Sequence, residues 1–243
     1  MWHPKRGQHL PQEVCDQLRT MILKGRYRAG DKLPPERKLA ETLGVNRATL
    51  REALKTLEQL GLVRSRQGDG TRVLDFVQTA GLDLLRHLIP VSDDAGAGIL
   101  RDILEFRQIV GRELARLAAE RSQPAQRDTL RDIALHSAAS REELLVQDFD
   151  FYFELARATG NVVFPLLINP VRTAVRSFSS FFADFIPPAE DVRAHHLEII
   201  AALERRDGDA ACDAADRHLR QGKEHLLEKV SSGPEVIVTG DPP

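Results

Sequence analysis

Two imidazoles and one carboxylate in the second half of the chain are of the types that bind transition metals. His196 and His218 lie eleven residues before and after Asp207, which belongs to a turn signal. If the flanking segments are antiparallel helices, arms of equal length at about 1.5 Å rise per residue bring both imidazoles to one level. Asp148 could supply an oxygen at the same point. This set suits Zn, Ni, Mn or Fe with open positions for water or a ligand; alternatively, the histidines make ordinary hydrogen bonds in the core or on the surface.

Arginines and small polar side chains gather around two predicted helices near the N-terminus. In a helix-turn-helix the second helix lies in the major groove, so its first turn and polar side can contact DNA. The residues at those positions are Asn46, Arg47, Thr49 and Arg51. The two guanidiniums, four residues apart, can bind guanine O6/N7 or phosphate. Arg37 in the preceding helix is placed to contact a phosphate or a base edge. Alternatively, these arginines only solvate a helix face.

Three short helices must position these side chains. Apolar residues at helical spacing predict a helix over 11–24 that stops at Gly25. Pro34-Pro35-Glu36 begins a second helix that Gly44 ends. Asn46 stands where an N-cap belongs, and the third helix ends near Gly61.

A β-hairpin follows the third helix. Segments 62–66 and 71–74 flank the turn Gln67-Gly68-Asp69-Gly70, whose residues tolerate positive φ. Arg66, Gln67 and Gly68 at its tip form a predicted wing, and Gly68 lets the backbone approach a groove closely.

The rest of the chain shows only helical patterns. Predicted helices cover residues 79–89, 99–121, 125–139, 142–159, 162–185, 189–206 and 208–230. We therefore expect a mainly α protein, with an N-terminal winged helix-turn-helix followed by an all-α bundle of six to seven helices. The expected domains are residues 1–76 for DNA binding and 77–230 for effector binding and dimerisation, with a disordered tail over 231–243.

Composition and charge narrow the class of protein. The chain has 243 residues, 42% of them hydrophobic and 29% charged, which excludes fibrous and wholly disordered proteins. The first 74 residues carry 15 Lys and Arg against 8 Asp and Glu, and the remainder 19 against 28. Such asymmetry is typical of a protein whose one half contacts a polyanion. Two distant cysteines, no signal peptide and no membrane span predict a cytoplasmic protein.

The stretch GRYRAGDKLPPERKLAETLGVNRATLREALKTLEQLGLVRSRQGDGTRV, from Gly25 to Val73, resembles the winged helix of the GntR superfamily of bacterial transcription regulators. The resemblance implies that Arg37, Arg47, Thr49 and Arg51 contact the operator, that Asn46 caps the recognition helix and that Gly68 lies in the wing. Pro35 stands where the family usually has Ser, and Asn46 where it has Ser or Thr. Both replacements keep a plausible helix start.

The helical half resembles the effector domain of the FadR subgroup, called the FCD domain, through DFDFYFEL from Asp148, then ATGN, and HLEIIAALERRDGDAACDAADRHL from His196. In that family the metal ligands are an Asp, a His four residues later and two further His; Asp148, His196 and His218 match three of them. Tyr152 stands at the fourth, and a phenol is a poor ligand at neutral pH. Arg107 matches an arginine that faces the family's cavity, where it could hold a carboxylate; alternatively, it forms a salt bridge with Glu105 or Asp148.

The resemblance implies a ligand-responsive regulator, by default a repressor, that binds a palindromic operator as a homodimer. We expect a small organic acid as effector. The alternative is an acyl-CoA, because parts of the chain resemble fatty-acid-responsive regulators, and Tyr152 agrees with that metal-free branch. A metal-dependent enzyme is the competing class. It is disfavoured because the sequence lacks a Gly-x-Ser-x-Gly, a phosphate-binding loop and a His-Glu-x-x-His motif.

Overall fold

The computed structural model describes residues 10–88, 94–183 and 186–232. The chain divides into two compact units, Met1–Val91 and Ser92–Pro243. This division lies further along the chain than the expected boundary after residue 76. Residues beyond 76 pack into the first unit: the Thr79 hydroxyl donates to the Gly61 carbonyl at 2.7 Å, and Leu84 and Leu88 are buried.

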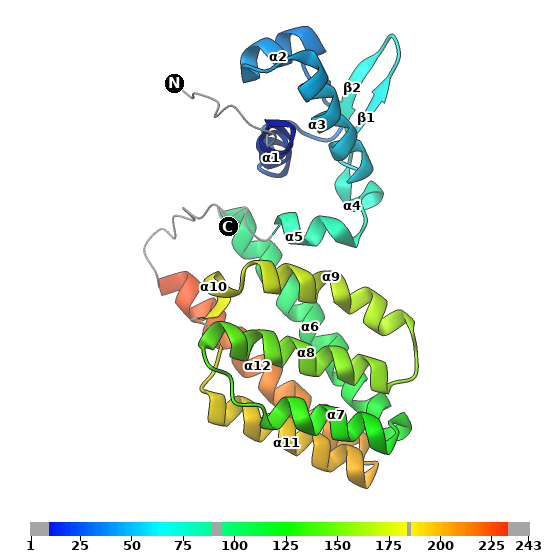
Figure 1. Ribbon diagram of the computed structural model, residues 1–243, viewed down its shortest axis with the longest axis vertical. Helices are drawn as coiled ribbons and strands as arrows, with labels where there is room; N and C mark the ends of the chain where they lie inside the picture. Colours follow the sequence, from blue (N-terminus) through cyan, green and yellow to red (C-terminus); the bar gives the residue numbers. More distant parts are fainter. Residues whose placement is uncertain (1–9, 89–93, 184–185, 233–243) are drawn as a thin grey trace. The chain divides into compact units, whose positions relative to one another are not determined.

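The first unit is a three-helix core with a two-stranded wing (Figure 1). Its elements are α1 (Leu10–Leu23), α2 (Glu36–Leu43), α3 (Arg47–Gln59), β1 (Val63–Arg66), β2 (Gly70–Val73), α4 (Phe76–Thr79), the 3-10 helix η1 (Leu82–Leu84) and α5 (Leu85–Leu88). Helix α3 buries Leu50, Leu54 and Leu57, and it packs on α1 and α2. Gly44 takes the left-handed conformation with φ 68° and ends α2 before the turn into α3. The expected helix-turn-helix is confirmed.

The wing is an antiparallel hairpin in which Val63 pairs with Val73 and Arg66 with Gly70. At its base, Gly61 has φ +73°, and a Cβ atom there would lie 2.4 Å from the Thr79 carbonyl oxygen. Only glycine therefore fits where the chain from α4 passes the start of β1.

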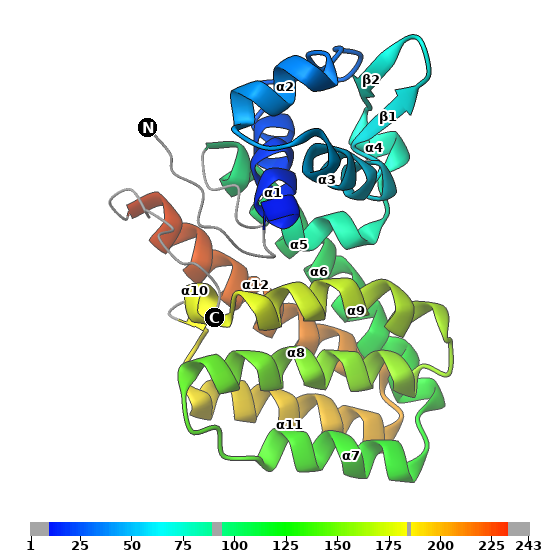
Figure 2. The same cartoon turned by 45° about the horizontal axis from the view of Figure 1, so that its top comes forward.

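The second unit is an all-helical bundle, as expected, with seven helices in its described part (Figures 1 and 2). They are α6 (Asp94–Arg121), α7 (Pro124–Leu135), α8 (Arg141–Ala158), α9 (Val163–Ser177), α10 (Ser179–Phe182), α11 (Ala189–Arg205) and α12 (Gly208–Ser232). Helix α6 packs most extensively against α12, while α8 contacts α6, α7 and α9. Among the described residues, no helix is both long and apolar enough to cross a membrane.

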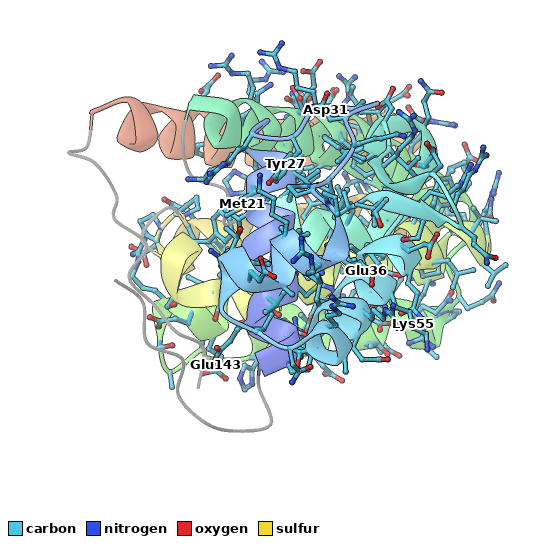
Figure 3. The ribbon with its side chains drawn as sticks, turned by 90° about the horizontal axis from the view of Figure 1, so that it is seen from above. Met21, Tyr27, Asp31, Glu36, Lys55 and Glu143 are labelled. Atoms are coloured by element: carbon cyan, nitrogen blue, oxygen red, sulfur yellow. The ribbon has the colours of Figure 1, made fainter. Side chains whose placement is uncertain are left out.

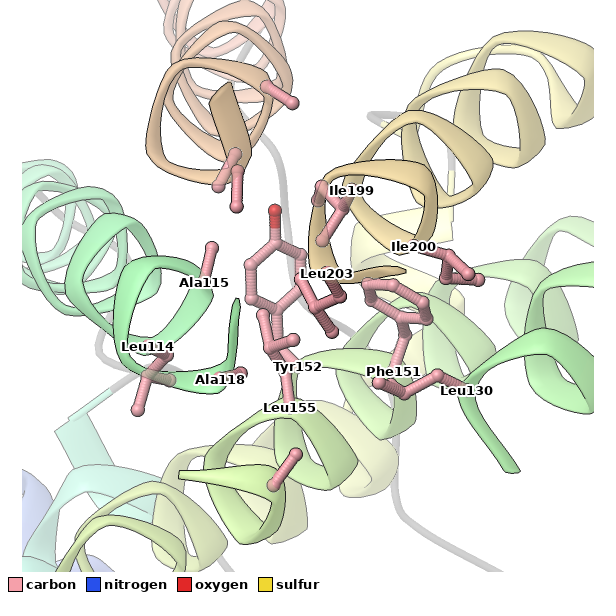
Figure 4. Packing of buried hydrophobic residues seen from close by; sticks show 14 of the residues in the cluster. Leu114, Ala115, Ala118, Leu130, Phe151, Tyr152, Leu155, Ile199, Ile200 and Leu203 are labelled. Carbon is pink, nitrogen blue, oxygen red and sulfur yellow. The ribbon is translucent and has the colours of Figure 1, made fainter. Parts of the chain in front are cut away.

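The bundle core combines large side chains with small ones that let the helices approach closely. Phe151 and Leu155 from α8 meet Leu203 from α11 (Figure 4). Facing alanines on α6 and α12, among them Ala115, Ala118, Ala211, Ala214 and Ala215, are wholly buried. At Gly111 an added Cβ would lie 2.4 Å from Leu219 Cδ1. The Leu219 side chain of α12 therefore packs directly against the backbone of α6.

Two expected helices are interrupted. The helix predicted over 79–89 is divided, because Ala80 and Gly81 are extended, with ψ of 152° and 177°. Thr79 is the last residue of α4, η1 and α5 follow up to Leu88, and residue 89 lies outside the described part. The helix predicted over 162–185 ends at Ser177, where Phe178 leaves helical geometry, and α10 follows; residues 184–185 lie outside the described part. Pro170 lies inside α9. At the C-terminus α12 continues to Ser232, so the expected disordered tail is wrong for 231–232; residues 233–243 lie outside the described part.

Candidate functional site

The first candidate site is the exposed side of the helix-turn-helix. The Asn46 side chain accepts a hydrogen bond from the Thr49 backbone N–H at 2.8 Å, which confirms the expected N-cap of α3. Arg47, the first residue of α3, is exposed, and Thr49 is half-buried in the same turn. Figure 3 draws the side chains as sticks, with Glu36 at the start of α2 and Lys55 on α3 labelled. The expected groove-facing residues therefore share one end of α3.

Two of the expected DNA contacts are arginines with acidic neighbours. Arg51 Nε donates to Glu36 Oε2 at 2.8 Å, across the turn between α2 and α3. Arg37 Nη1 lies 3.8 Å from Glu41 Oε1, and both side chains are largely exposed. The Arg51 pairing was not foreseen from the sequence, where the two residues stand 15 positions apart.

The wing tip is exposed and its turn is held by charge. Gln67 and Gly68 are exposed at the tip, and Gly68 has φ +82°. Asp69 accepts a hydrogen bond from Arg72 Nε at 2.9 Å and pairs with Lys32. The hydrogen bonds from Arg72 and then Lys32 lower the pKa of the Asp69 carboxyl to about 2.

The second candidate site is a buried polar cluster in the bundle. The Asp148 carboxylate on α8 meets His196 of α11 and His218 of α12, and all three side chains are buried. Oxygen Oδ1 of Asp148 lies 2.9 Å from His196 Nε2 and 2.8 Å from His218 Nε2. The other oxygen, Oδ2, accepts a hydrogen bond from Arg107 of α6. The structure thus brings together the three residues predicted as metal ligands, and it forms the salt bridge weighed as an alternative for Arg107.

The charges in this cluster keep Asp148 ionised. Burial alone raises the pKa of its carboxyl, but the charges of His218 and Arg107 and the hydrogen bonds from both histidines lower it more. The net pKa therefore lies well below the usual value. Burial lowers the pKa of His196, because the bond to Asp148 only partly offsets the lost hydration.

Several polar atoms around the cluster have no hydrogen-bond partner among the described residues. They are Arg107 Nε, Tyr152 Oη, His196 Nδ1 and His218 Nδ1. The Tyr152 ring lies between α6 and α11 with its hydroxyl toward α12 (Figure 4). Burial, and then the charge of Asp148, raise the pKa of the Tyr152 phenol, so this side chain is neutral. Buried polar atoms without a partner are rare in proteins and costly, and a bound water, ion or ligand is one way to satisfy them.

An apolar pocket adjoins the cluster. Its empty volume is about 380 Å³, counted out to its open mouth. It is lined by Phe106, Arg107, Val110, Gly111, Leu114, Phe149, Tyr152, Ile168 and Val171. Both expected effector residues, Arg107 and Tyr152, thus line the pocket. The apolar lining was missed, although the spacing of its α6 members follows one helix face and could have indicated it.

The residues of the cluster fit a divalent metal with three protein ligands. The Asp148, His196 and His218 ligand atoms lie within 4.8 Å of one another, and both imidazoles direct Nε2 toward the same carboxylate oxygen. One oxygen and two nitrogens leave positions open for water or a ligand. The neutral Tyr152 phenol adds no fourth charged ligand.

Comparisons with known proteins match both units. The family described as "Bacterial regulatory proteins, gntR family" matches residues 10–73, and the "FCD domain" matches residues 102–221. A relative from Mycobacterium tuberculosis, the HTH-type transcriptional regulator Mce2R, is 40% identical over 70% of this chain and 72% of its own length. The Uxu operon transcriptional regulator of Escherichia coli is 32% identical over 89% of this chain and 86% of its own length.

More distant relatives extend the same pattern. The fatty acid metabolism regulator protein of Proteus mirabilis is 25% identical over 84% of this chain and 83% of its own length. Among solved structures, the regulator Lar of Listeria monocytogenes has a TM-score of 0.58 at 16% identity, covering 92% of this chain and 99% of the other. That structural likeness bears on the fold alone.

Proposed function

Because the chain belongs to the gntR family of bacterial regulatory proteins and carries an FCD domain, we propose that it is a ligand-responsive repressor that binds a palindromic operator as a homodimer. The family is one of DNA-binding transcriptional regulators and not of enzymes, so the polar cluster in the bundle serves binding rather than turnover. We place its action in the cytoplasm. The observation that carries the proposal is the Asn46-capped helix α3 with exposed Arg47 at its first position.

In this proposal each α3 enters the major groove of one half-site. Arg47 and Arg51 contact base edges, Arg37 contacts phosphate or a base edge, and the wing at Gln67 and Gly68 approaches the neighbouring groove. A ligand in the bundle biases how the two DNA-binding units are held. A coupling of about 1–3 kcal/mol changes DNA affinity by about 5- to 150-fold, so a modest shift is enough.

We propose a small organic acid as the effector. Arg107 supports it, because this guanidinium lines the pocket and its Nε has no partner among the described residues. A planar guanidinium binds carboxylates well. A divalent ion held by Asp148, His196 and His218 would act as a Lewis acid toward such a ligand. Asp148 would be oriented for it by Arg107, and Tyr152 Oη would offer a hydrogen bond to the ligand.

An acyl-CoA is the second candidate effector. The favouring observation is the pocket lining, in which Phe106, Val110, Leu114, Ile168 and Val171 present an apolar surface that suits a hydrocarbon chain.

Operator binding tests the proposed function. Duplexes enriched from a random pool by the full-length protein should share a palindromic motif. Arg47→Ala should weaken binding to that motif by about 1–3 kcal/mol at fixed salt. Arg131→Ala, on α7 of the other unit, is the matched control and should bind as the wild type does. Failure to enrich any motif, or equal binding by Arg47→Ala, would overturn the assignment of α3.

Thermal unfolding with and without ligands tests the effector. A compound that binds only the folded protein raises the free energy of unfolding, by about 2.7 kcal/mol at a hundredfold excess over its Kd. The midpoint temperature of unfolding rises with it. Small carboxylates, long-chain acyl-CoAs and Zn²⁺, Ni²⁺ or Mn²⁺ form the panel. A carboxylate effect lost on Arg107→Ala supports the acid; an acyl-CoA effect that survives this substitution supports the alternative. A metal effect should vanish in the double variant His196→Ala/His218→Ala.

A further inference from the structure

The ion pair between Glu36 and Arg51 connects the two helices of the helix-turn-helix. Glu36 is the first residue of α2, and Arg51 lies one turn into α3. Arg51 Nε donates to Glu36 Oε2 at 2.8 Å, while the side chains remain 67% and 39% exposed. The guanidinium is therefore held on one side and open to solvent on the other.

This pair contributes little to folding. Ion pairs between exposed side chains are screened by water and salt and add almost nothing measurable. The acidic side chain would be favourable at the N-terminus of α2 even without a partner. Its effect must therefore be sought in what it does to Arg51.

The hydrogen bond occupies one edge of the guanidinium and leaves another free. Arg51 has five N–H donors in a rigid plane, and Nε is the one that Glu36 uses. The two terminal Nη groups remain available as an end-on fork. Such a fork can donate two hydrogen bonds at once, one to O6 and one to N7 of a guanine.

The carboxylate also biases which part of DNA Arg51 can approach. A negative charge beside the guanidinium repels phosphate oxygens more than it repels the neutral edge of a base. Arg47 differs, because it makes no ion pair with another described residue. Arg37 differs as well, because its guanidinium lies 3.8 Å from Glu41, beyond a hydrogen bond.

We propose that Glu36 is a positioning residue that sets base specificity by holding Arg51 with its end-on fork toward the major groove. The proposal rests on the proposed function, in which α3 contacts the operator. Glu36 itself does not contact the base. It restricts the Arg51 guanidinium to one orientation, and its charge disfavours contact of that guanidinium with the DNA phosphates.

The test compares base preferences of full-length variants on one random duplex pool. Arg51→Ala first identifies the position in each half-site whose preference depends on this side chain. Glu36→Gln then removes the charge and keeps the size. The preference for the best base at that same position should fall by about three- to tenfold. Affinity for a scrambled duplex should stay equal or become tighter, because a negative charge has been removed.

Glu52→Gln is the matched control. Glu52 is the exposed neighbour of Arg51 in α3, and its substitution removes the same charge. It should leave the preference at the Arg51 position unchanged. Equal thermal midpoints of Glu36→Gln and the wild type show that the effect is not one of folding.

The outcomes separate this proposal from the proposed function. A wild-type protein that enriches no motif overturns the function itself. A wild-type motif that Glu36→Gln recognises with the same preference overturns only the role of Glu36. A uniform loss of affinity across all positions, or an equal change in Glu52→Gln, would also overturn it.

Discussion

Asp69 illustrates at the scale of one residue how the wing is fixed. Its carboxylate lies between Arg72 and Lys32, and these hydrogen bonds lower its pKa to about 2 from the ordinary 3.8. Because the folded pKa is the lower one, the stabilisation is fully present above pH 3.8 and is lost as the pH falls through about 2. The hairpin therefore keeps this contact throughout the neutral range.

Arg72→Ala should raise the pKa of Asp69 back toward 3.8, since Arg72 is the largest cause of its depression. Titration of the side-chain carboxyl carbon by NMR measures this directly. Arg66→Ala removes the same charge from the same hairpin and should leave the pKa of Asp69 near 2. An Asp69 that still titrates near 2 without Arg72 would show that the ion pair is not its cause.

The sequence was enough to predict which residues of the helix-turn-helix are exposed, but not which side chains form ion pairs with one another. Helical period and cap chemistry predicted that Asn46 would begin α3 and that Arg47 would be exposed. The contact of Arg51 with Glu36 depends on the angle between two helices and on side-chain rotamers, which the sequence does not specify locally. The bond between Arg107 and Asp148 was foreseen only as one of several alternatives for the same reason.

At the scale of elements, the passage of the α4 segment beside the start of β1 depends on Gly61. Gly61→Ala combines a left-handed φ of +73° with a clash against the Thr79 carbonyl oxygen at 2.4 Å. Gly25→Ala is a matched control, because Gly25 has φ +72° with open space around it. Both variants should lose about 1 kcal/mol through backbone strain, and Gly61→Ala should lose about 1–3 kcal/mol more through the clash.

Chemical denaturation of the two variants measures the difference. Equal losses would mean that the α4 segment moves aside without cost and that the close approach contributes nothing to the fold.

Elements with a strong apolar period were predicted well, and those that depend on chain breaks were not. The wing hairpin and the longer helices of the bundle begin where their patterns predicted to within a few residues, although α7 ends at Leu135 and α9 at Ser177, earlier than expected. The segment after the wing has enough apolar residues for one helix, but Ala80 and Gly81 are extended and divide it. Thr79 donates its hydroxyl to Gly61 there. A hydrogen bond between residues 18 positions apart cannot be predicted from the local spacing of apolar residues.

At the scale of the whole molecule, each unit has its own core. Leu57 is wholly buried in the first unit and Leu203 in the second. Leu57→Ala should therefore lower the free energy of unfolding of the first unit only, and Leu203→Ala that of the second unit only, each by about 2–5 kcal/mol. The unfolding transition of the affected unit should move to a lower temperature. Differential scanning calorimetry of the full chain provides the measurement, and each variant is the control for the other. Equal displacement of a single transition by both would show that the units unfold as one.

The charge asymmetry along the chain indicated two parts, and the structure has two units. The boundary expected after residue 76 was too early, because the helical pattern over 79–89 was assigned to the bundle, whereas the division falls after Val91. In the structure the segment up to Val91 belongs to the first unit, and Thr79 in this segment bonds to Gly61 at the base of the wing.

The convergence of α6, α8, α11 and α12 on Asp148 also has a kinetic consequence. Its contacts with Arg107, His196 and His218 span 41, 48 and 70 residues, so long loops must close before any of them can form. We expect the carboxylate to keep its hydration until the surrounding helices have packed, because burial without all its partners is unfavourable. These bonds should therefore be absent from the folding transition state. In a chevron plot, Asp148→Asn should increase the unfolding rate and leave the refolding rate nearly unchanged. The cluster would then determine the lifetime of the folded bundle rather than the speed at which it forms.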